Sequence, residues 1–382
     1  MYRMEIKDKG FLCGDLDIQE IFSNPANARK QVYPAEFAPL DSPHALRNVF
    51  VKEMHSSCGN TLTFLAPCLR PNCDLSRELE ILAELKKLNQ ETQARIAPYF
   101  PSPIAVIRDS WASYKIISEH GGQDLSRYLY ARCKRDQMLP HFSNYRRTVL
   151  VSQLYAAEDF LFQHNIVHCG LSPEHILYDP GAEQIKICGF TRNQRVNADG
   201  RLYFDRLLSE QKYEEDEMPP EYACRHHDGN DAGGRLVSVE ASSFLVYIFC
   251  KTVLEAFILN GISYSDTSDS NIGMLRAFFP HYKTRPSCCA IGPTFPLVEH
   301  TDFKLVSLGV IIIIISEHIY SILLFRSRIE MKNMLVCGLE LEPLDRVLWS
   351  SIKKSLEQYA ELELRFLAEG HVEEFAPPLA SI

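Results

Sequence analysis

The hydrophobic pattern of this 382-residue chain changes at Gly121-Gly122. Before these glycines, short runs rich in β-branched and aromatic residues alternate with turns, which is typical of strands. After them, long segments carry apolar residues every three or four positions, which is typical of helices. A strand-rich part followed by a helical part predicts an α+β fold, and the length suffices for two domains or one domain of two lobes.

The part before Gly121 is expected to hold four strands and one helix. Leucines from Leu75 to Leu88 recur at three and four residues, which predicts a helix beginning near Asp74. Two predicted strands precede this helix and two follow it. The four strands are Lys30–Phe37, Arg47–Met54, Ile104–Ile107 and Tyr114–Ile117.

The later part is expected to be mainly helical. Its predicted helices are Tyr145–Gln163, Val237–Leu259, Leu305–Phe325 and Leu344–Leu367, and its predicted short strands are Ile176–Tyr178 and Ile185–Cys188. The segment Leu305–Phe325 has the length of a membrane span. Because Glu317 and His318 interrupt its apolar run, we interpret it as a buried core helix, and no membrane span is expected.

Charge and cysteine usage limit the classes of partner and the compartment. The chain has 40 Lys and Arg against 49 Asp and Glu, a net charge of -9, which argues against general binding of nucleic acid or anionic membranes. The N-terminus lacks an apolar signal segment, and the 12 cysteines form no C-x-x-C pair. We therefore expect a cytoplasmic protein, with the nucleus also open, whose cysteines are core residues.

Two motifs in the later part carry the most information about function. One begins at His168 and reads HCGLSPEHIL, and the other is Ile187-Cys188-Gly189-Phe190, whose glycine follows His175 by 14 residues. Together they resemble the catalytic loop and the metal-binding loop of the eukaryotic protein kinases. Three further segments match this family in the right order: Val49–Lys52 resembles the strand of the ATP-contacting lysine, Arg77–Leu82 the regulatory helix and Ile116–Leu125 the hinge.

The resemblance covers roughly residues 20–320 and implies a two-lobed protein kinase-like fold. In this interpretation, residues 1–19 are an N-terminal extension and 20–118 a small antiparallel β-rich lobe with one regulatory helix. Residues 119–125 are the hinge, and 126–382 are a larger, mostly helical lobe.

The central helix of the larger lobe has two candidates. Val239–Phe249 offers Glu240 in place of the family's Asp, whereas Asp302–Glu317 contains the family's S-L-G-V-I at Ser307–Ile311. The sequence favours the second by a small margin, which makes residues 223–300 an insertion. The closing arginine of the family's last motif has no convincing match.

The catalytic positions implied by the resemblance lack the groups that phosphoryl transfer needs. Transfer requires a carboxylate near the acceptor hydroxyl and oxygen ligands that hold Mg²⁺ on the phosphates. Gly170 stands for the catalytic Asp, His175 for the metal-binding Asn and Gly189 for the metal-binding Asp. No metal and no catalytic residue are therefore expected, and His168 is interpreted as a packed core histidine.

The phosphate loop is degenerate as well. Pro25, Asn27 and Lys30 stand where the family's glycines approach the phosphates, and the glycines Gly10 and Gly14 form only a weak alternative. A polar cluster around His226-His227, with Cys224 and Asp228, is not expected to hold zinc.

Lys52 and Glu78 keep the residue types of the family's ATP-contacting lysine and its glutamate partner, and two interpretations of them stay open. They form a residual nucleotide site that binds phosphate without metal, or they are an ion pair that ties a helix to the sheet. The second is favoured.

The expected function is that of a catalytically inactive kinase-like protein, a pseudokinase. It would act as a scaffold or allosteric regulator of a protein partner, such as an active kinase or its substrate. No cofactor is expected, although ATP without Mg²⁺ remains possible. One alternative is a metal-independent nucleotide switch that uses Lys52 with Arg29 or Lys30. Another is an atypical active Ser/Thr kinase that recruits Glu174 or Asp179 as its carboxylate.

Overall fold

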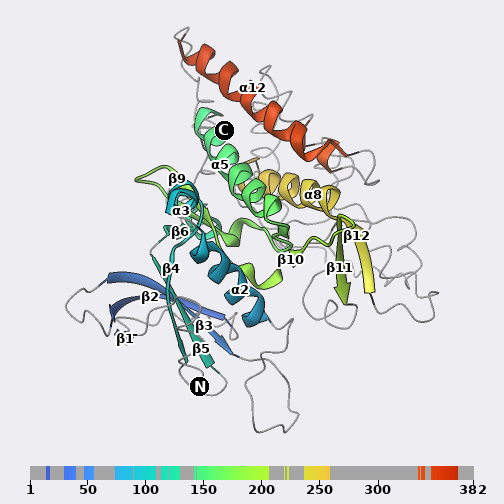
Figure 1. The fold of residues 1–382 in the computed structure, drawn as a ribbon. Coiled ribbons are helices and arrows are strands. Elements are labelled where there is room, and N and C mark those ends of the chain that lie inside the picture. The colour runs from blue at the N-terminus through green and yellow to red at the C-terminus, as the bar shows by residue number, and fades with distance from the viewer. Residues whose placement is uncertain are drawn as a thin grey trace, which may run out of the picture. The chain divides into compact units, whose positions relative to one another are not determined.

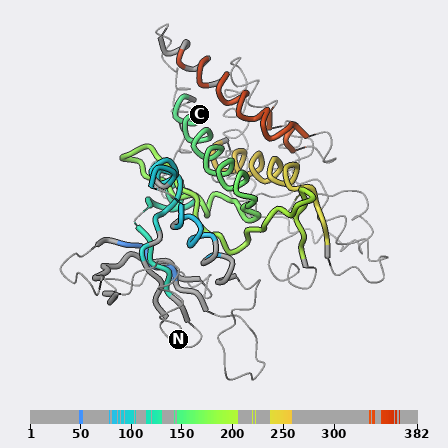
Figure 2. The backbone as a smooth tube through the Cα atoms, in the orientation of Figure 1, coloured from blue at the N-terminus to red at the C-terminus, as the bar shows by residue number. Residues whose placement is uncertain are grey.

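The structure is a computed structural model of the chain (Figure 1), and Figure 2 traces its backbone. It describes residues 14–17, 30–39, 47–55, 74–88, 90–108, 113–119, 121–129, 142, 144–205, 219, 222, 236–258, 334–335, 337–339 and 346–368. These residues form helices and small antiparallel sheets, which confirms the predicted α+β class.

The described residues divide into two compact units. The first contains those up to Asp124 together with Ala156–Phe160 and His175–Asn193. The second contains Leu125–Tyr155, Leu161–Glu174 and those from Gln194 onward.

The first unit is built on a five-stranded antiparallel sheet with the order β1-β2-β3-β5-β4. Its centre is the pairing of β3 with β5, in which Val51 lies opposite Ile117 and both side chains are fully buried. The strands are β1 (Gly14–Asp17), β2 (Lys30–Pro39), β3 (Arg47–His55), β4 (Pro103–Arg108) and β5 (Ser113–Glu119). The four predicted strands are therefore confirmed to within two residues at each end.

Two helices follow β3 in the chain, and the first is the one that the leucine spacing predicted. Helix α2 is Asp74–Lys87 and α3 is Gln90–Ile96. Ile81, Leu82 and Leu85 form the buried side of α2. Glu78, one turn earlier, is also buried, so this face of the helix carries one carboxylate into the interior.

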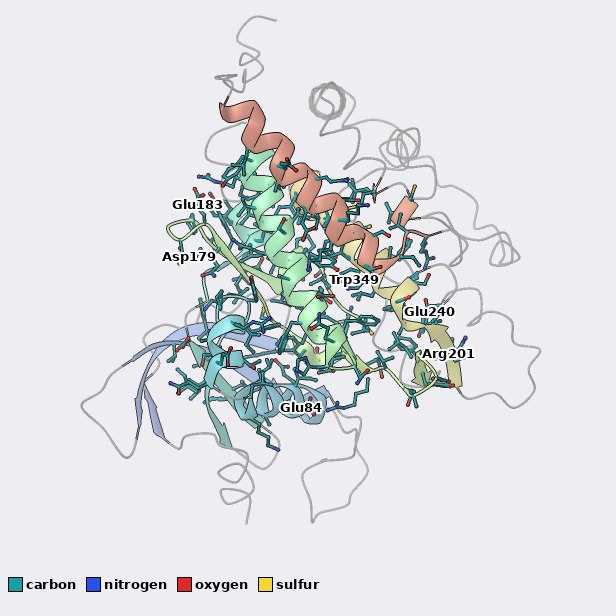
Figure 3. All side chains as sticks on the ribbon, turned by 45° about the horizontal axis from the view of Figure 1, so that its top comes forward. Glu84, Asp179, Glu183, Arg201, Glu240 and Trp349 are labelled. Carbon is teal, nitrogen blue, oxygen red and sulfur yellow. The ribbon has the colours of Figure 1, made fainter. Side chains whose placement is uncertain are left out.

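A second, smaller sheet of the first unit has the order β6-β8-β9, with β6 (Gln123–Asp124), β8 (Ile176–Asp179) and β9 (Gln184–Ile187). The turn between β8 and β9 is capped by Asp179, whose Oδ1 accepts bonds from the Gly181 and Ala182 amides at 2.9 and 3.2 Å. Asp179 and Glu183 are labelled at this turn in Figure 3.

The second unit is mainly helical. Helix α5 (Asn144–Gln163) contributes all but Ala156–Phe160 to it, and Figure 1 shows α5, α8 and α12 side by side. Its other helices are α8 (Ala241–Val253), which continues into a π-helical turn at Leu254–Ile258, and α12 (Trp349–Ala368). Two antiparallel ribbons complete it: β7 (Ile166–Val167) with β10 (Gln194–Arg195), and β11 (Arg201–Asp205) with β12 (Leu236–Glu240).

Aromatic packing holds the three helices of the second unit together. The Tyr155 ring of α5 stacks on Trp349 of α12, with 4.5 Å between centroids. Phe249 of α8 packs edge-on against Trp349 at 5.3 Å and against Tyr155 at 6.0 Å. Offset and edge-to-face aromatic pairs contribute about 0.5–1.5 kcal/mol each beyond the area that they bury.

The prediction of one helix over Val237–Leu259 is wrong at its start. Leu236–Glu240 is a strand, because these residues pair with β11, and the helix begins only at Ala241. The Glu240 carboxylate accepts bonds from the Ser242 and Ser243 amides and caps the helix.

The apolar run Leu305–Phe325 and the candidate central helix Asp302–Glu317 lie outside the described residues. Within the part of the chain that the structure describes, no helix is both long and apolar enough to cross a membrane.

Candidate functional site

The Lys52 and Glu78 side chains form an ion pair in the first unit. The Lys52 Nζ lies 2.7 Å from Oε1 and 2.6 Å from Oε2 of Glu78, so the ammonium donates to both carboxylate oxygens. The side chains are 17% and 5% exposed, respectively. The pair joins β3 to α2, as the structural interpretation of these residues predicted.

Cys188, which follows β9, lies in the electrostatic field of this pair. Burial raises the pKa of its thiol to about 12, while the positive charge of Lys52 opposes the shift and the carboxylates of Glu78 and Asp124 add to it. A thiol that stays protonated is a poor nucleophile and metal ligand. Cys188 is therefore a neutral thiol within the electrostatic influence of the Lys52–Glu78 pair.

His175 and Gly189 are brought together at the open end of the β8–β9 hairpin. The Cys188 amide donates to the His175 carbonyl at 2.9 Å, one step beyond the pairing of Ile176 with Ile187. Neither position carries an oxygen ligand. The resemblance assigns both metal ligands to these positions, so the two positions themselves offer Mg²⁺ only an imidazole and backbone carbonyls.

His168 and Gly170 belong to the second unit, in the loop after β7. The His168 side chain is fully buried, and its carbonyl accepts from the Leu171 amide at 3.2 Å. The Leu171 carbonyl in turn accepts from the Thr252 hydroxyl of α8 at 3.0 Å. The burial of His168 agrees with its interpretation as a packed core histidine, and the Thr252 hydroxyl ties the loop to α8.

The structure describes both of the proposed substitute carboxylates. Asp179 caps the hairpin turn at the opposite end of β8 from His175, about 13 Å along the strand at 3.3 Å per residue. Glu174 is exposed, in the short 3₁₀ turn Pro173–His175.

Several predicted site residues fall outside the described part of the chain. They are Gly10, Pro25, Asn27, Arg29, Cys224, His226, His227 and Asp228, and for Lys30 and Gly14 only the backbone is described. Among the described residues, no cluster of three or more His, Cys, Asp or Glu side chains is arranged to hold a metal ion.

The sequence analysis missed Arg346, which precedes α12. This buried guanidinium donates from Nη1 to the Ser243 carbonyl at 3.1 Å and to its hydroxyl at 3.3 Å, and it lies 5.0 Å from the centre of the Tyr247 ring. Arg346 thus fixes the first turn of α8. The available signal was a single arginine just before an amphipathic helix, which is weak.

Replacing Arg346 with lysine is expected to lower the free energy of unfolding by about 1–2 kcal/mol, because an ammonium keeps the charge but loses the planar contact with Tyr247. Urea denaturation followed by tryptophan fluorescence measures the change, since Trp349 is three residues away. Lys353→Arg, at an exposed position of α12, is the control and should change stability little. Equal effects of the two variants would contradict a specific role for the guanidinium.

A second missed residue is Glu158 of α5, in the part of this helix that belongs to the first unit. Its side chain is fully buried, and neither carboxyl oxygen has a hydrogen-bond partner among the described residues. Burial raises the pKa of Glu158 from 4.5 to about 8. The signal was present, because Glu158 shares the apolar helix face of Leu154 and Leu161.

Searches with models of protein families and among curated proteins find no match to this chain.

Proposed function

We propose that this chain has a two-lobed protein kinase-like fold, has lost phosphotransfer, and acts as a scaffold or allosteric regulator of a protein partner. The partner would be an active kinase or a kinase substrate. The carrying observation is the Lys52–Glu78 ion pair, which joins a sheet to a helix as the resemblance requires. The positions that should hold the base and the metal, Gly170 and Gly189, have no carboxylate.

The element order supports the kinase-like fold. Three strands, a helix pair and three strands, β4 to β6, come first. A long helix, the two-residue strand β7 and the β8–β9 hairpin follow, and His175 and Gly189 flank this hairpin. The five-stranded antiparallel sheet fits the small lobe that the resemblance implies.

We take α8 as the central helix of the larger lobe. From Ser243 to Val253 every side chain of this helix is buried, and both Thr252 and the turn after Glu240 are fixed by hydrogen bonds. Arg346 then takes the place of the closing arginine for which the sequence offered no match. This choice favours Val239–Phe249 over Asp302–Glu317. It also keeps β12 and α8 in the lobe, so residues 223–300 are not an insertion as a whole.

The chemistry of the described residues favours the scaffold over the two alternatives. An active kinase would need a replacement carboxylate, and Asp179 is committed to its turn. The Lys52–Glu78 pair forms without a nucleotide, as a structural tether requires, and the thermal unfolding described below separates the tether from a nucleotide switch.

An assay of phosphate transfer tests the proposal. The whole chain is incubated with γ-labelled ATP, Mg²⁺ or Mn²⁺ and a generic protein substrate, with an active kinase in parallel as the positive control. We expect no transfer and no autophosphorylation. Transfer above background by the purified chain, abolished in Lys52→Ala, would overturn the proposal.

Thermal unfolding with ATP separates the scaffold from the nucleotide switch. A ligand at one hundred times its dissociation constant stabilises a protein by about 2.7 kcal/mol, so nucleotide binding is easily seen. We expect no shift with ATP, with or without Mg²⁺. A shift that is indifferent to Mg²⁺ and absent in Lys52→Met/Glu78→Leu, which removes the cation and should keep stability, would instead support the switch.

A further inference from the structure

The two lost metal-ligand positions are held in contact by the hairpin between them. The register of β8 and β9 pairs Ile176 with Ile187, and the bond from the Cys188 amide to the His175 carbonyl extends that pairing. Continuing this register sets His175 opposite Cys188, so Gly189 lies one residue further along, where the His175 ring reaches it.

Gly189 has a backbone conformation that side chains rarely adopt. Its φ of 83° and ψ of 47° are left-handed, and it precedes the short 3₁₀ turn Phe190–Arg192. A Cβ at this position would lie 2.3 Å from Cδ2, 2.9 Å from Nε2 and 3.1 Å from Cγ of His175. The imidazole thus fills the space that any side chain at position 189 needs.

The backbone around Gly189 has little freedom to relieve this contact. On one side the Cys188 amide is bonded to the His175 carbonyl. On the other side the Phe190 ring is buried, and its centroid lies 6.1 Å from that of the Phe100 ring, which in turn packs against Phe160. Close-packed interiors of this kind resist a shift of the main chain, so relief has to come from the imidazole.

We propose that the His175 imidazole is a steric plug over Gly189. It excludes every side chain from position 189, so the loop after β9 accepts no carboxylate ligand there unless His175 is replaced at the same time. The significance of the plug rests on the proposed function, because under that function both position 175 and position 189 must change before the metal site can return. The plug itself is a matter of packing.

Gly200 provides a matched control for the backbone strain. Its φ of 75° is also left-handed, but a Cβ there would meet no atom within 4 Å. Gly200→Ala therefore measures the cost of a left-handed alanine alone. Gly189→Ala measures that cost together with the contact to His175.

The test compares the thermal midpoints of four variants without metal or nucleotide. Gly200→Ala is expected to lower the midpoint by roughly 2–4 °C. Gly189→Ala is expected to lower it by at least about twice as much. In a His175→Ala background, the same Gly189→Ala change should fall to the level of Gly200→Ala, because the ring is gone. The fourth variant, His175→Ala alone, supplies the reference for that step.

A Gly189→Ala effect equal to that of Gly200→Ala would overturn the plug, since the imidazole would then swing aside freely. An effect of Gly189→Ala that persists in the His175→Ala background would overturn it as well. If Gly189→Ala does not fold, folding of His175→Ala/Gly189→Ala supports the plug, and failure of both variants contradicts it. Phosphate transfer by the unaltered chain would sink the proposed function and leave these comparisons unaffected.

Hydrogen exchange of the Cys188 amide gives a local check. Its bond to the His175 carbonyl lies next to the contact, so Gly189→Ala should speed exchange at this amide at least about tenfold. Gly200→Ala, at a position in the second unit, should leave it unchanged.

Discussion

Replacing Glu158 with glutamine is expected to raise the free energy of unfolding at pH 7 by roughly 3 kcal/mol. Burial holds the pKa of this carboxyl at about 8, against 4.5 when it is exposed. Below pH 4.5 the Glu158 carboxyl is protonated in both the folded and the unfolded chain, so its ionisation does not change the free energy of unfolding. Between pH 4.5 and 8 only the unfolded chain releases the proton, so stability falls by about 1.4 kcal/mol per pH unit. Glutamine has the same shape and does not titrate.

The gain in Glu158→Gln should accordingly be near zero at pH 4.5, grow to pH 8 and level off above it. Urea denaturation at a series of pH values measures it. Glu357→Gln is the control, because that exposed carboxyl on α12 is in water in both states. A gain that does not vary between pH 5 and 8 would contradict the assignment of a neutral, buried acid.

Replacing Lys52 with alanine is expected to destabilise the first unit by about 2–4 kcal/mol. The substitution leaves the Glu78 carboxylate, whose side chain is 5% exposed, without its cation. Replacing both partners with apolar residues, Lys52→Met/Glu78→Leu, should return stability to within about 1 kcal/mol of the starting chain, because no buried charge is then left uncompensated.

A double-mutant cycle of Lys52→Met, Glu78→Leu and the two together, measured in urea, separates these effects, with Lys87→Ala, at an exposed position of α2, as the control. If the double variant were as unstable as Lys52→Ala, the structural tether would be the wrong interpretation of the pair. If Lys52→Ala changed stability no more than Lys87→Ala, the pair would have no structural role.

The sequence predicts the elements that carry a regular hydrophobic pattern. Helices α2 and α5 were found because apolar residues recur every three or four positions in the sequence, and the four longer strands were found because β-branched and aromatic residues cluster in short runs. The two-residue strands β6, β7 and β10 have no such pattern. The pairing of β11 with β12 joins segments more than 30 residues apart, and it converts the start of an apolar run into a strand.

The candidate site was predictable only as far as residue types allow. The resemblance named Lys52 and Glu78, and the structure joins them. The contact between His175 and Gly189 depends on a left-handed backbone and on a ring orientation, neither of which the sequence encodes locally. Arg346 was missed because its contacts with Ser243 lie 103 residues away in the chain.

The position of the His175 ring over Gly189 also affects how substitutions at these two positions can follow one another in evolution. Under the proposed function, restoring a ligand at position 189 takes a change at both positions, and a side chain that appears at 189 before His175 changes lowers stability without returning activity. Proteins lie only slightly above the stability they need, so an intermediate of this kind tends to be removed by selection. Under the proposed function, a metal ligand can therefore return at 189 only after position 175 has changed, which fixes the order in which the two substitutions can occur.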